Sequence, residues 1–374
     1  MDVDHRRPLI ARPPGRAHGR RQRRARALGG HRVWIARQPA GKTEQNEANV
    51  VHNPHGGSVP GQAHSPLLHS MTESSDAPIS ISTARPRFEV RLWNVRGSHA
   101  APGQGAVRYG GHTTCVEVRC DDRVLVIDMG SGACRLGSAL LAERPTGPLE
   151  IDILFSHLHS DHIIGLPFFE PLYLERTRLR IRGDDDKNVG LRAGLQRLMS
   201  FPLFPVDLDE VPADLSVTHL GAGDTARLGD VTLRTCALNH PGGALGFRIE
   251  HRGKAFVHLS DREHVGEDTD PALIALCEGA DWICYDGMFV EGIDFERHRG
   301  WGHSTWQAAV RLVEALERPA RLIVTHHAPS HDDAFLDRQG EALGAALPGA
   351  LMAIEGMEIC LLSEQVRLPH PAGA

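Results

Sequence analysis

The sequence predicts an α/β fold in which two β-sheets pack face to face and helices cover their outer sides. Three observations lead to this prediction. The chain contains two β-rich stretches, each is followed by helical segments, and residues 87–365 suffice for one large domain. Sheets and helices that each bury one side combine in a few layered architectures, and this order of segments favours a sandwich.

The first β-rich stretch begins near Arg87, because apolar and other residues alternate over 88–93 as in a half-buried strand. A turn around Asp121 and Asp122 is expected to make a hairpin of the next two strands. The run 151–155 is apolar enough for a fully buried strand. The strands predicted in this half are 88–93, 114–118, 124–128, 151–155 and 175–182, and the helices are 138–143 and 191–199.

The second β-rich stretch is denser in strands and ends in helices. The segment 305–316 is a clear amphipathic helix, and Ser304 before it is a natural N-cap. Its strands are predicted at 231–236, 245–250, 255–259, 282–285 and 321–325, and its other helices at 271–278 and 335–346.

Residues 1–86 are predicted to be a disordered basic extension. Residues 1–70 carry 12 basic and four acidic side chains, a net charge of +8, whereas the remaining chain carries 29 basic and 43 acidic ones, a net charge of −14. Arginine, proline and glycine dominate the extension, which offers too little apolar surface to offset chain entropy. Translation from Met71 would omit most of it. No apolar segment follows its arginine pairs, so a secretory signal is not expected, while a transit peptide stays open.

Composition also disfavours several classes of protein. No apolar run approaches the roughly 18 residues of a membrane span, so no membrane association is expected. The seven cysteines are odd in number and form no C-x-x-C pair, which favours reduced, buried thiols in a cytoplasmic protein. The acidic body argues against a broad polyanion-binding surface.

The strongest chemical feature is an H-x-H-x-D-H pattern directly after the strand 151–155. It consists of His157, His159, Asp161 and His162. His157 and His159 are two residues apart, so they point the same way in extended backbone. Four imidazole and carboxylate donors within six residues suit two adjacent metal ions such as zinc, manganese or iron.

Further donors come at the ends of apolar strands downstream. His240 follows 231–236, Asp261 follows 255–259 and His326 follows 321–325. Strand ends are where α/β proteins build their sites. Each residue alone would be an ordinary hydrogen-bonded side chain, so the information lies in the order of the whole set.

Over about residues 87–365 this arrangement resembles the metallo-β-lactamase fold superfamily, an αββα sandwich with its site between the sheets. The resemblance implies two divalent metal ions, zinc first with manganese or iron as alternatives, and a metal-bridging hydroxide as nucleophile. It also implies that Asp128 orients a ligating histidine. The implied ligands are His157, His159 and His240 for one ion, Asp161, His162 and His326 for the other, and Asp261 as the bridge.

A second resemblance, to the ribonuclease Z and phosphodiesterase branch of that superfamily, concerns the reaction. It implies that Asp286 orients His303, which either donates a proton to the leaving oxygen or stabilises the charge of the phosphorane. Asp161, Asp286 and His303 are therefore the implied catalytic residues, with aspartate at 286 where many members have glutamate. The segments that carry this resemblance are 285–289 (YDGMF), 302–305 (GHST), 95–98 (VRGS), 108–115 (RYGGHTTC) and 325–333 (THHAPSHDD).

Three features keep more than one interpretation. His326, not His327, is taken as the ligand because it directly ends the strand. His327 and His331 either face a substrate phosphate or, together with Asp332 and Asp333, cap the helix that follows. The alternating arginines of 176–182 favour a solvated sheet edge, balanced by the aspartates of 184–186, over a nucleic-acid track.

These observations favour a metal-dependent hydrolase, specifically a dinuclear phosphodiesterase for a small, cyclic phosphodiester. A tRNA 3′-processing endonuclease is the alternative, but 163–239 contain no Gly/Pro-rich basic arm and the body is acidic, so nucleic acid is disfavoured as a partner. A carbon-ester or lactone hydrolase and a non-catalytic binding protein of the same fold are further alternatives. Proton donation by His303 argues against the former, and the complete donor set argues against the latter. A homodimer stays open.

Overall fold

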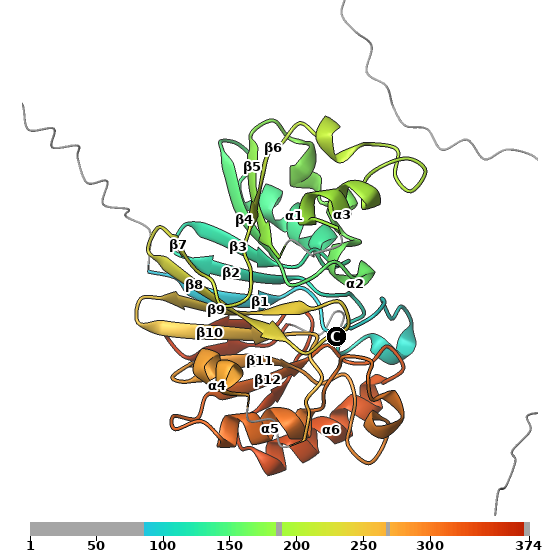
Figure 1. The fold of residues 1–374 in the computed structure, drawn as a ribbon, viewed down its shortest axis with the longest axis vertical. Coiled ribbons are helices and arrows are strands. Elements are labelled where there is room, and N and C mark those ends of the chain that lie inside the picture. Colours follow the sequence, from blue (N-terminus) through green and yellow to red (C-terminus); the bar gives the residue numbers. More distant parts are fainter. Residues whose placement is uncertain (1–85, 185–188, 267–269, 370–374) are drawn as a thin grey trace, which may run out of the picture. The chain divides into compact units, whose positions relative to one another are not determined.

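The protein was studied as a computed structural model that describes residues 86–184, 189–266 and 270–369. The predicted extension over residues 1–86 lies outside these residues except for its last position. In the described part, two sheets pack face to face and helices lie on both outer sides (Figure 1). The predicted α/β sandwich is therefore confirmed.

The first sheet has eight strands. They are β1 (Phe88–Leu92), β2 (Val116–Cys120), β3 (Arg123–Ile127), β4 (Leu149–Phe155), β5 (Thr177–Gly183), β6 (Asp214–His219), β14 (Glu358–Cys360) and β15 (Gln365–Arg367). Their order across the sheet is β15-β14-β1-β2-β3-β4-β5-β6. The predicted hairpin pairs β2 with β3, whereas β3 to β6 run parallel.

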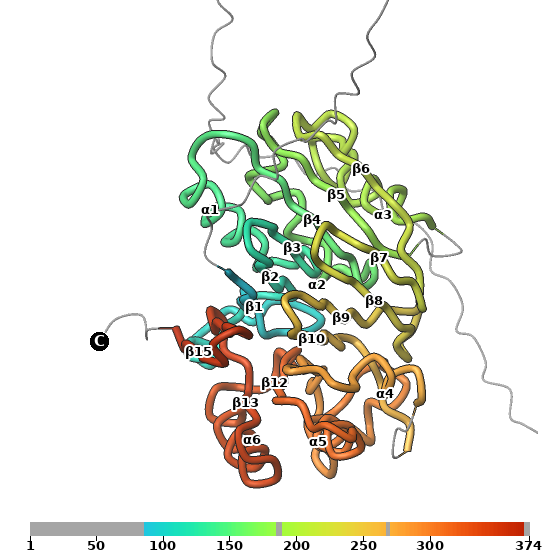
Figure 2. The backbone as a smooth tube through the Cα atoms, turned by 90° about the vertical axis from the view of Figure 1, so that its left-hand side faces the viewer, coloured from blue at the N-terminus to red at the C-terminus, as the bar shows by residue number. Residues whose placement is uncertain are grey.

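The second sheet has seven strands. They are β7 (Thr225–Leu228), β8 (Val231–Leu238), β9 (Ala244–His251), β10 (Lys254–Leu259), β11 (Trp282–Asp286), β12 (Arg321–Thr325) and β13 (Leu351–Met352). They follow one another in the order β13-β12-β11-β10-β9-β8-β7, and Figure 2 shows β8, β9 and β10 beside the first sheet. Because β10, β11 and β12 are parallel, their carboxyl ends meet at one edge.

Six α-helices occur among the described residues. They are α1 (Ala133–Glu143), α2 (Ser160–Ile163), α3 (Leu191–Leu198), α4 (Pro271–Cys277), α5 (Trp306–Glu314) and α6 (Asp333–Ala346). Short 3₁₀ turns are η1 (Gln104–Ala106), η2 (Leu166–Phe168), η3 (Glu170–Tyr173), η4 (Leu208–Glu210) and η5 (Phe295–His298). α3 packs on β6, α4 on β8 and β9, and α5 on β11 and β12. None of the helices described is long and apolar enough to cross a membrane.

Strand β3 shows how the sequence builds two cores at once. Leu125 and Ile127 belong to the apolar cluster between the two sheets, whereas Val124 and Val126 belong to the cluster that includes α1. Successive side chains of a strand point to opposite faces, so a continuous apolar run buries both. This strand carries the chain directly to Asp128 at the predicted site.

The cysteines fit these cores. Five of the seven are buried, and all seven are free thiols. The expectation of unpaired, mostly buried cysteines is therefore confirmed.

The predicted ends of two helices were wrong. α1 begins at Ala133, five residues before the predicted start. α5 is capped by Thr305, whose hydroxyl accepts a hydrogen bond from the amide of Ala308 over 3.1 Å. Ser304 is buried instead, with its hydroxyl 2.8 Å from Nδ1 of His264. The Thr305 hydroxyl therefore caps the helix, while the Ser304 hydroxyl contacts His264 in the interior.

The arginines of β5 do not lie on a sheet edge, because β5 pairs with both β4 and β6. Arg178 and Arg180 form ion pairs with Glu150, and Arg182 pairs with Asp152. The expected sheet edge was wrong, but these charges are balanced by neighbouring strands and do not form a free basic track.

Candidate metal centre

The seven predicted ligands converge where strands of both sheets end. β4 leads to His157 and His159, and α2 then carries Asp161 and His162. His240 follows β8, Asp261 follows β10, and His326 follows β12. Since the donors come from both sheets, only the assembled sandwich brings them together.

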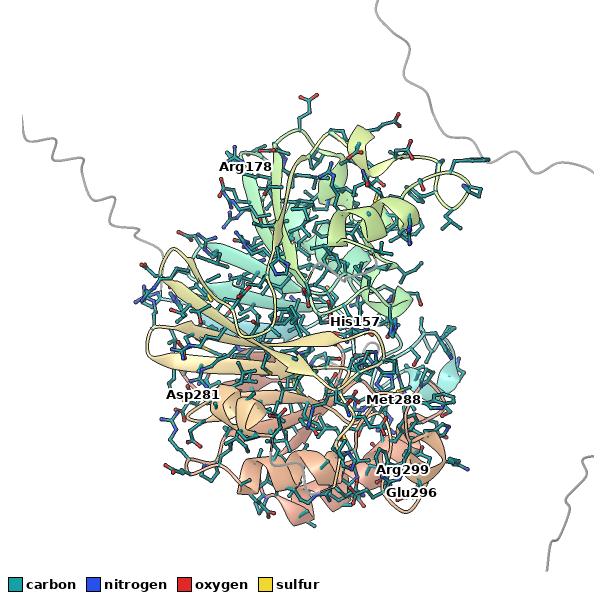
Figure 3. The ribbon with its side chains drawn as sticks, viewed as in Figure 1. His157, Arg178, Asp281, Met288, Glu296 and Arg299 are labelled. Carbon is teal, nitrogen blue, oxygen red and sulfur yellow. The ribbon has the colours of Figure 1, made fainter. Side chains whose placement is uncertain are left out.

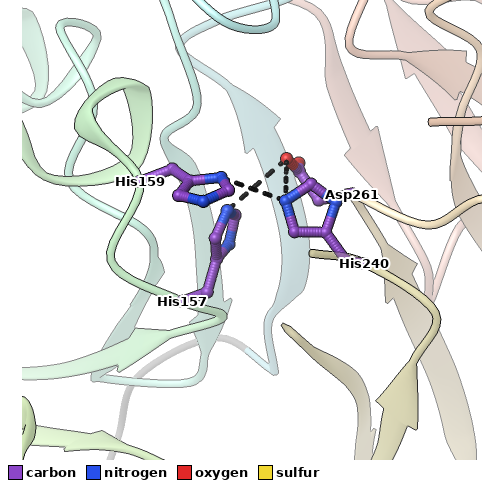
Figure 4. A group of neighbouring side chains, drawn as sticks. All are labelled: His157, His159, His240 and Asp261. Atoms are coloured by element: carbon purple, nitrogen blue, oxygen red, sulfur yellow. Dashed lines mark hydrogen bonds and ion pairs between the residues drawn. The ribbon is translucent and has the colours of Figure 1, made fainter. Parts of the chain in front are cut away.

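The first donor group consists of His157, His159, His240 and Asp261 (Figure 4). Each offers one ligand atom, and these atoms lie within 4.8 Å of one another. Nε2 of His240 is 3.0 Å from Nδ1 of His159, and Nε2 of His157 is 3.6 Å from Oδ2 of Asp261. His159 is exposed, so solvent and ligands can reach this group from its side.

The second donor group consists of Asp161, His162, Asp261 and His326, all of them buried. Nε2 of His162 lies 3.1 Å from Oδ1 of Asp261, and Nε2 of His326 lies 3.3 Å from the same oxygen. Asp261 thus belongs to both groups and presents one oxygen to each. Its position matches that expected of a carboxylate between two cations.

The unpaired atoms of the site fit metal ions. Nε2 of His157, His162 and His326 are buried and have no hydrogen-bond partner among the described residues. A buried polar atom without a partner costs about 1–3 kcal/mol. Three such nitrogens around one carboxylate suit divalent cations of the zinc type.

The opposite ring nitrogens are held by partners outside the donor groups. Nδ1 of His162 donates to Asp128 over 2.8 Å, and Nδ1 of His240 donates to the carbonyl of Gly302 over 2.8 Å. Nδ1 of His326 lies 3.1 Å from the hydroxyl of Ser260. Such contacts fix the ring orientation of ligating histidines. The sequence pointed to Asp128 alone, because a backbone carbonyl and a serine carry no motif.

Three residues at the centre have left-handed backbone although none is glycine. Their φ angles are 60° for Asp128, 61° for Asp261 and 62° for His326. Each comes at or just after the end of a strand. Non-glycine residues reach this region at a cost and concentrate at functional sites.

The charges around the centre favour cations. Burial lowers the pKa of His162, but the carboxylates of Asp261, Asp128 and Asp161 outweigh burial and raise this pKa well above its ordinary value. Burial raises the pKa of Asp261, but His162 and His326 lower it more, so that it stays ionised. His157 is different, because burial lowers its pKa well below the usual range and leaves a neutral imidazole.

Asp286 and His303 form a pair beside the second donor group. Oδ2 of Asp286 accepts a hydrogen bond from Nδ1 of His303 over 2.9 Å, so the aspartate reaches its histidine. Both residues lie with Asp261 and His326 in a further group of donor atoms within 4.8 Å. Burial lowers the pKa of His303, but Asp286 raises it more, to about 9.

His327 and His331 lie outside the donor groups. Nε2 of the fully buried His327 donates to the carbonyl of Ala353 over 3.1 Å, and Nε2 of His331 is 2.7 Å from Oδ2 of Asp294. The cap of α6 expected from this segment comes from Asp332, which accepts a hydrogen bond from the amide of Phe335, while the two histidines bond elsewhere. Both imidazoles are bonded to protein groups and hold loops together.

A cavity of about 340 Å³ opens beside the first donor group. His157 and His159 form part of its wall, and Arg197 adds a guanidinium group. Its apolar wall includes Phe155, Leu158, Leu191 and Pro241. Asp184 also lines it, so the cavity offers apolar contact, one positive charge and one negative charge next to the exposed side of the centre.

Comparisons with known proteins agree with this geometry. The family model described as Beta-lactamase superfamily domain matches residues 123–327, which contain every proposed metal ligand. A ribonuclease Z from Exiguobacterium sp. is 28% identical over 215 residues, which are 46% of this chain and 69% of that protein.

Solved structures share the fold. The metallo-beta-lactamase fold protein YhfI from Bacillus subtilis superposes with a TM-score of 0.55 at 17% identity, over 74% of this chain and 100% of that one. A diphosphatase from the PhnP family superposes with a TM-score of 0.52 at 18% identity, again over 74% and 100%. The αββα layers are thus those of a known fold.

Proposed function

Since this chain belongs to the β-lactamase superfamily of metal-dependent hydrolases, we propose that it is a phosphodiesterase that cleaves a small, cyclic phosphodiester. The observation that carries the proposal is the hydrogen bond between Asp286 and His303 beside the two donor groups. It puts a proton donor next to a centre that attracts anions once cations are bound.

We assign the donor groups to two divalent ions, with zinc favoured by the mixture of imidazole and carboxylate. His157, His159 and His240 would hold the first, Asp161, His162 and His326 the second, and Asp261 both. Bound cations supply Lewis acidity toward phosphoryl oxygens and lower the pKa of water. The protein's own contribution is to fix the imidazoles of His162, His240 and His326 by their other ring nitrogens.

His303 is assigned the role of general acid. Its Nδ1 is held by Asp286, so Nε2 is left to give its proton to the leaving oxygen. An alkoxide leaving group from ribose is a strong base and needs this proton. A thiolate leaves without this proton, so the pair favours phosphodiesters over thioesters. The substrate screen below separates phosphodiesters from lactones and other carbon esters, whose leaving group is also an alkoxide.

The cavity beside His157 and His159 supports a small substrate. Its volume of about 340 Å³ lies at the lower end of the range for small-molecule sites, about 300–1,000 Å³. Arg197 on its wall suits an anionic group. A mononucleotide or a sugar phosphate fits these dimensions.

The second candidate is a tRNA 3′-processing endonuclease, which the similarity to a ribonuclease Z favours. Against it stands the region from α2 to β8. Its described residues form strands of the first sheet with short helices, and its sequence lacks a Gly/Pro-rich basic arm.

A substrate screen tests the proposal. The purified chain is incubated with 2′,3′- and 3′,5′-cyclic nucleotides, a cyclic ribose phosphate, a tRNA precursor and p-nitrophenyl acetate, with Asp261→Ala as the inactive control. We expect hydrolysis of at least one cyclic phosphodiester by the wild type only. Cleavage of the tRNA precursor alone would replace the proposal by the second candidate, and hydrolysis of the carbon ester alone would reject both.

A further inference from the structure

Trp301 is a large aromatic side chain on the loop that leads into the centre. It is 60% exposed, although it lies two residues before His303. A solvent-exposed indole is unfavourable for an isolated chain, and tryptophan is enriched where ligands bind. Its surroundings indicate what it binds.

The loop around Trp301 is fixed by Glu263. The Glu263 carboxylate accepts hydrogen bonds from the amides of Gly300 and Gly302, each over 2.8 Å. Both glycines have φ of 86°, a conformation that other residues rarely adopt. One carboxylate thus holds the residues on both sides of the tryptophan. Because the loop is already ordered, ligand binding does not have to offset the entropy cost of ordering it.

The indole ring of Trp301 packs against His298, which in turn packs against a further aromatic ring. Its centroid lies 4.7 Å from that of His298 at 74°, and His298 stacks on Phe289 at 4.4 Å and 3°. Phe289 in turn contacts His303 edge to face, with centroids 6.1 Å apart. A continuous row of rings therefore connects the exposed indole with the proposed proton donor.

Trp301 lies close to the rim of the cavity. The neighbouring Gly302 accepts a hydrogen bond from His240, and a Cβ on Gly302 would lie 2.2 Å from Cδ of Pro241. Pro241 lines the cavity. Figure 3 shows Arg299, two residues before Trp301, and Met288 on the same side of the sandwich as His157.

The same loop carries exposed positive charge. Arg297 and Arg299 are exposed, and neither has a carboxylate within ion-pairing distance in the described part of the chain. The guanidinium of Arg299 lies 4.7 Å above the ring of Phe295. In a body whose net charge is −14, these two exposed arginines, four and two residues before Trp301, favour an anionic ligand at this loop.

We propose that Trp301 is a stacking platform for the nucleobase of the substrate. This inference rests on the proposed phosphodiesterase function and narrows it to nucleotide substrates. Every base presents a π-face to an aromatic side chain, and stacking contributes enough to change affinity about 5- to 150-fold. The base can belong to a mononucleotide or to the end of an RNA strand, since the stacking chemistry is the same.

Binding measurements on the full chain as purified test the platform. AMP and the base-free ribose 5-phosphate are titrated by calorimetry into wild type, Trp301→Ala and Trp301→Phe. We expect Trp301→Ala to weaken AMP at least about fivefold and Trp301→Phe to retain most of the affinity. Ribose 5-phosphate should bind all three within about twofold. Because Trp301 is exposed, the thermal unfolding temperature of both variants should match that of the wild type.

The outcomes separate the two proposals. The platform would be overturned if Trp301→Ala lost as much affinity for ribose 5-phosphate as for AMP. It would also be overturned if the wild type bound AMP no more tightly than ribose 5-phosphate. A single-stranded RNA that loses more affinity than AMP on Trp301→Ala would support it and identify RNA as the source of the base. AMP binding that depends on Trp301 in a protein without any phosphodiesterase activity would reject the proposed function while keeping the platform.

Discussion

Asp128 accepts a hydrogen bond from Nδ1 of His162 over 2.8 Å, and both side chains are completely buried. The bond leaves Nε2 as the ring atom that faces Asp261. It links the end of β3 to α2, so the half of the sandwich that holds the first sheet fixes the ring of His162, while the other half supplies Asp261 and His326. The orientation of this one ligand is thus set by groups of its own half.

Asp128→Asn tests this link. Asparagine keeps the size but loses the charge, so we expect metal affinity to fall about 10- to 100-fold. Competition with a chelating dye measures the affinity. Asp152→Asn is the matched control, because Asp152 is equally buried but pairs with Arg123 and Arg182. Wild-type metal affinity in Asp128→Asn would show that the carboxylate does not orient the ligand.

His303→Ala tests the proton donor. Loss of a general acid slows the departure of a basic leaving group, whereas p-nitrophenolate leaves without a proton. We expect kcat to fall about 100-fold or more with a cyclic nucleotide and much less with bis(p-nitrophenyl) phosphate. Asp286→Asn should show the same selectivity with a smaller loss. Similar losses on the two substrates would remove His303 from this role.

Gly97→Ala tests whether the backbone at Gly97 packs closely against His326 of the second donor group. A Cβ at position 97 would lie 2.2 Å from Cδ2 of His326, a distance that real side chains do not adopt. We expect the imidazole to be displaced, with loss of about one metal equivalent and most activity. Gly344→Ala in α6 is the control, since nothing lies within 4 Å of its Cβ. Full metal content in Gly97→Ala would contradict the proposed position of His326.

Much of this arrangement could be predicted because it lies in local patterns. Buried strands such as 151–155 are apolar at all but one position, and the donors follow them directly. The edge strand β6 was missed because its residues are mostly exposed and polar, so nothing in its pattern indicates burial. β13, β14 and β15 have two or three residues each and exist only through pairing with distant strands.

Other features of the site depend on contacts that one sequence does not show. The backbone carbonyl of Gly302 accepts the hydrogen bond of His240. Since every residue has such a carbonyl, the sequence does not show which one does so. Glu263 holds the loop of Trp301 from 37 positions away, and no spacing rule connects them. Thr305 caps the helix, whereas the Ser304 hydroxyl contacts His264; both residues are fully buried, so their roles are set by tertiary contacts.

The buried His258 is expected to make the free energy of unfolding depend on pH. It is 1% exposed, neither ring nitrogen has a partner among the described residues, and burial lowers its pKa to about 4. The unfolded chain, with a histidine pKa near 6.5, binds this proton more readily, so stability is lost as pH falls from about 6.5 to 4. The loss amounts to about 3 kcal/mol at most.

Urea unfolding of wild type and His258→Leu at pH 7 and pH 5 measures this contribution. We expect the difference in unfolding free energy between the two pH values to be smaller in His258→Leu. An identical pH dependence in both proteins would show that His258 is not the group responsible.

The central claim is that two metal ions lie between the sheets of each chain, and metal analysis of the purified full chain tests it most directly. Inductively coupled plasma mass spectrometry should find about two transition-metal equivalents per chain in the wild type. Asp161→Ala should retain about one equivalent and lose phosphodiester hydrolysis. A fully active wild type with one equivalent or none, or an Asp161→Ala variant with full metal content and activity, would contradict the claim.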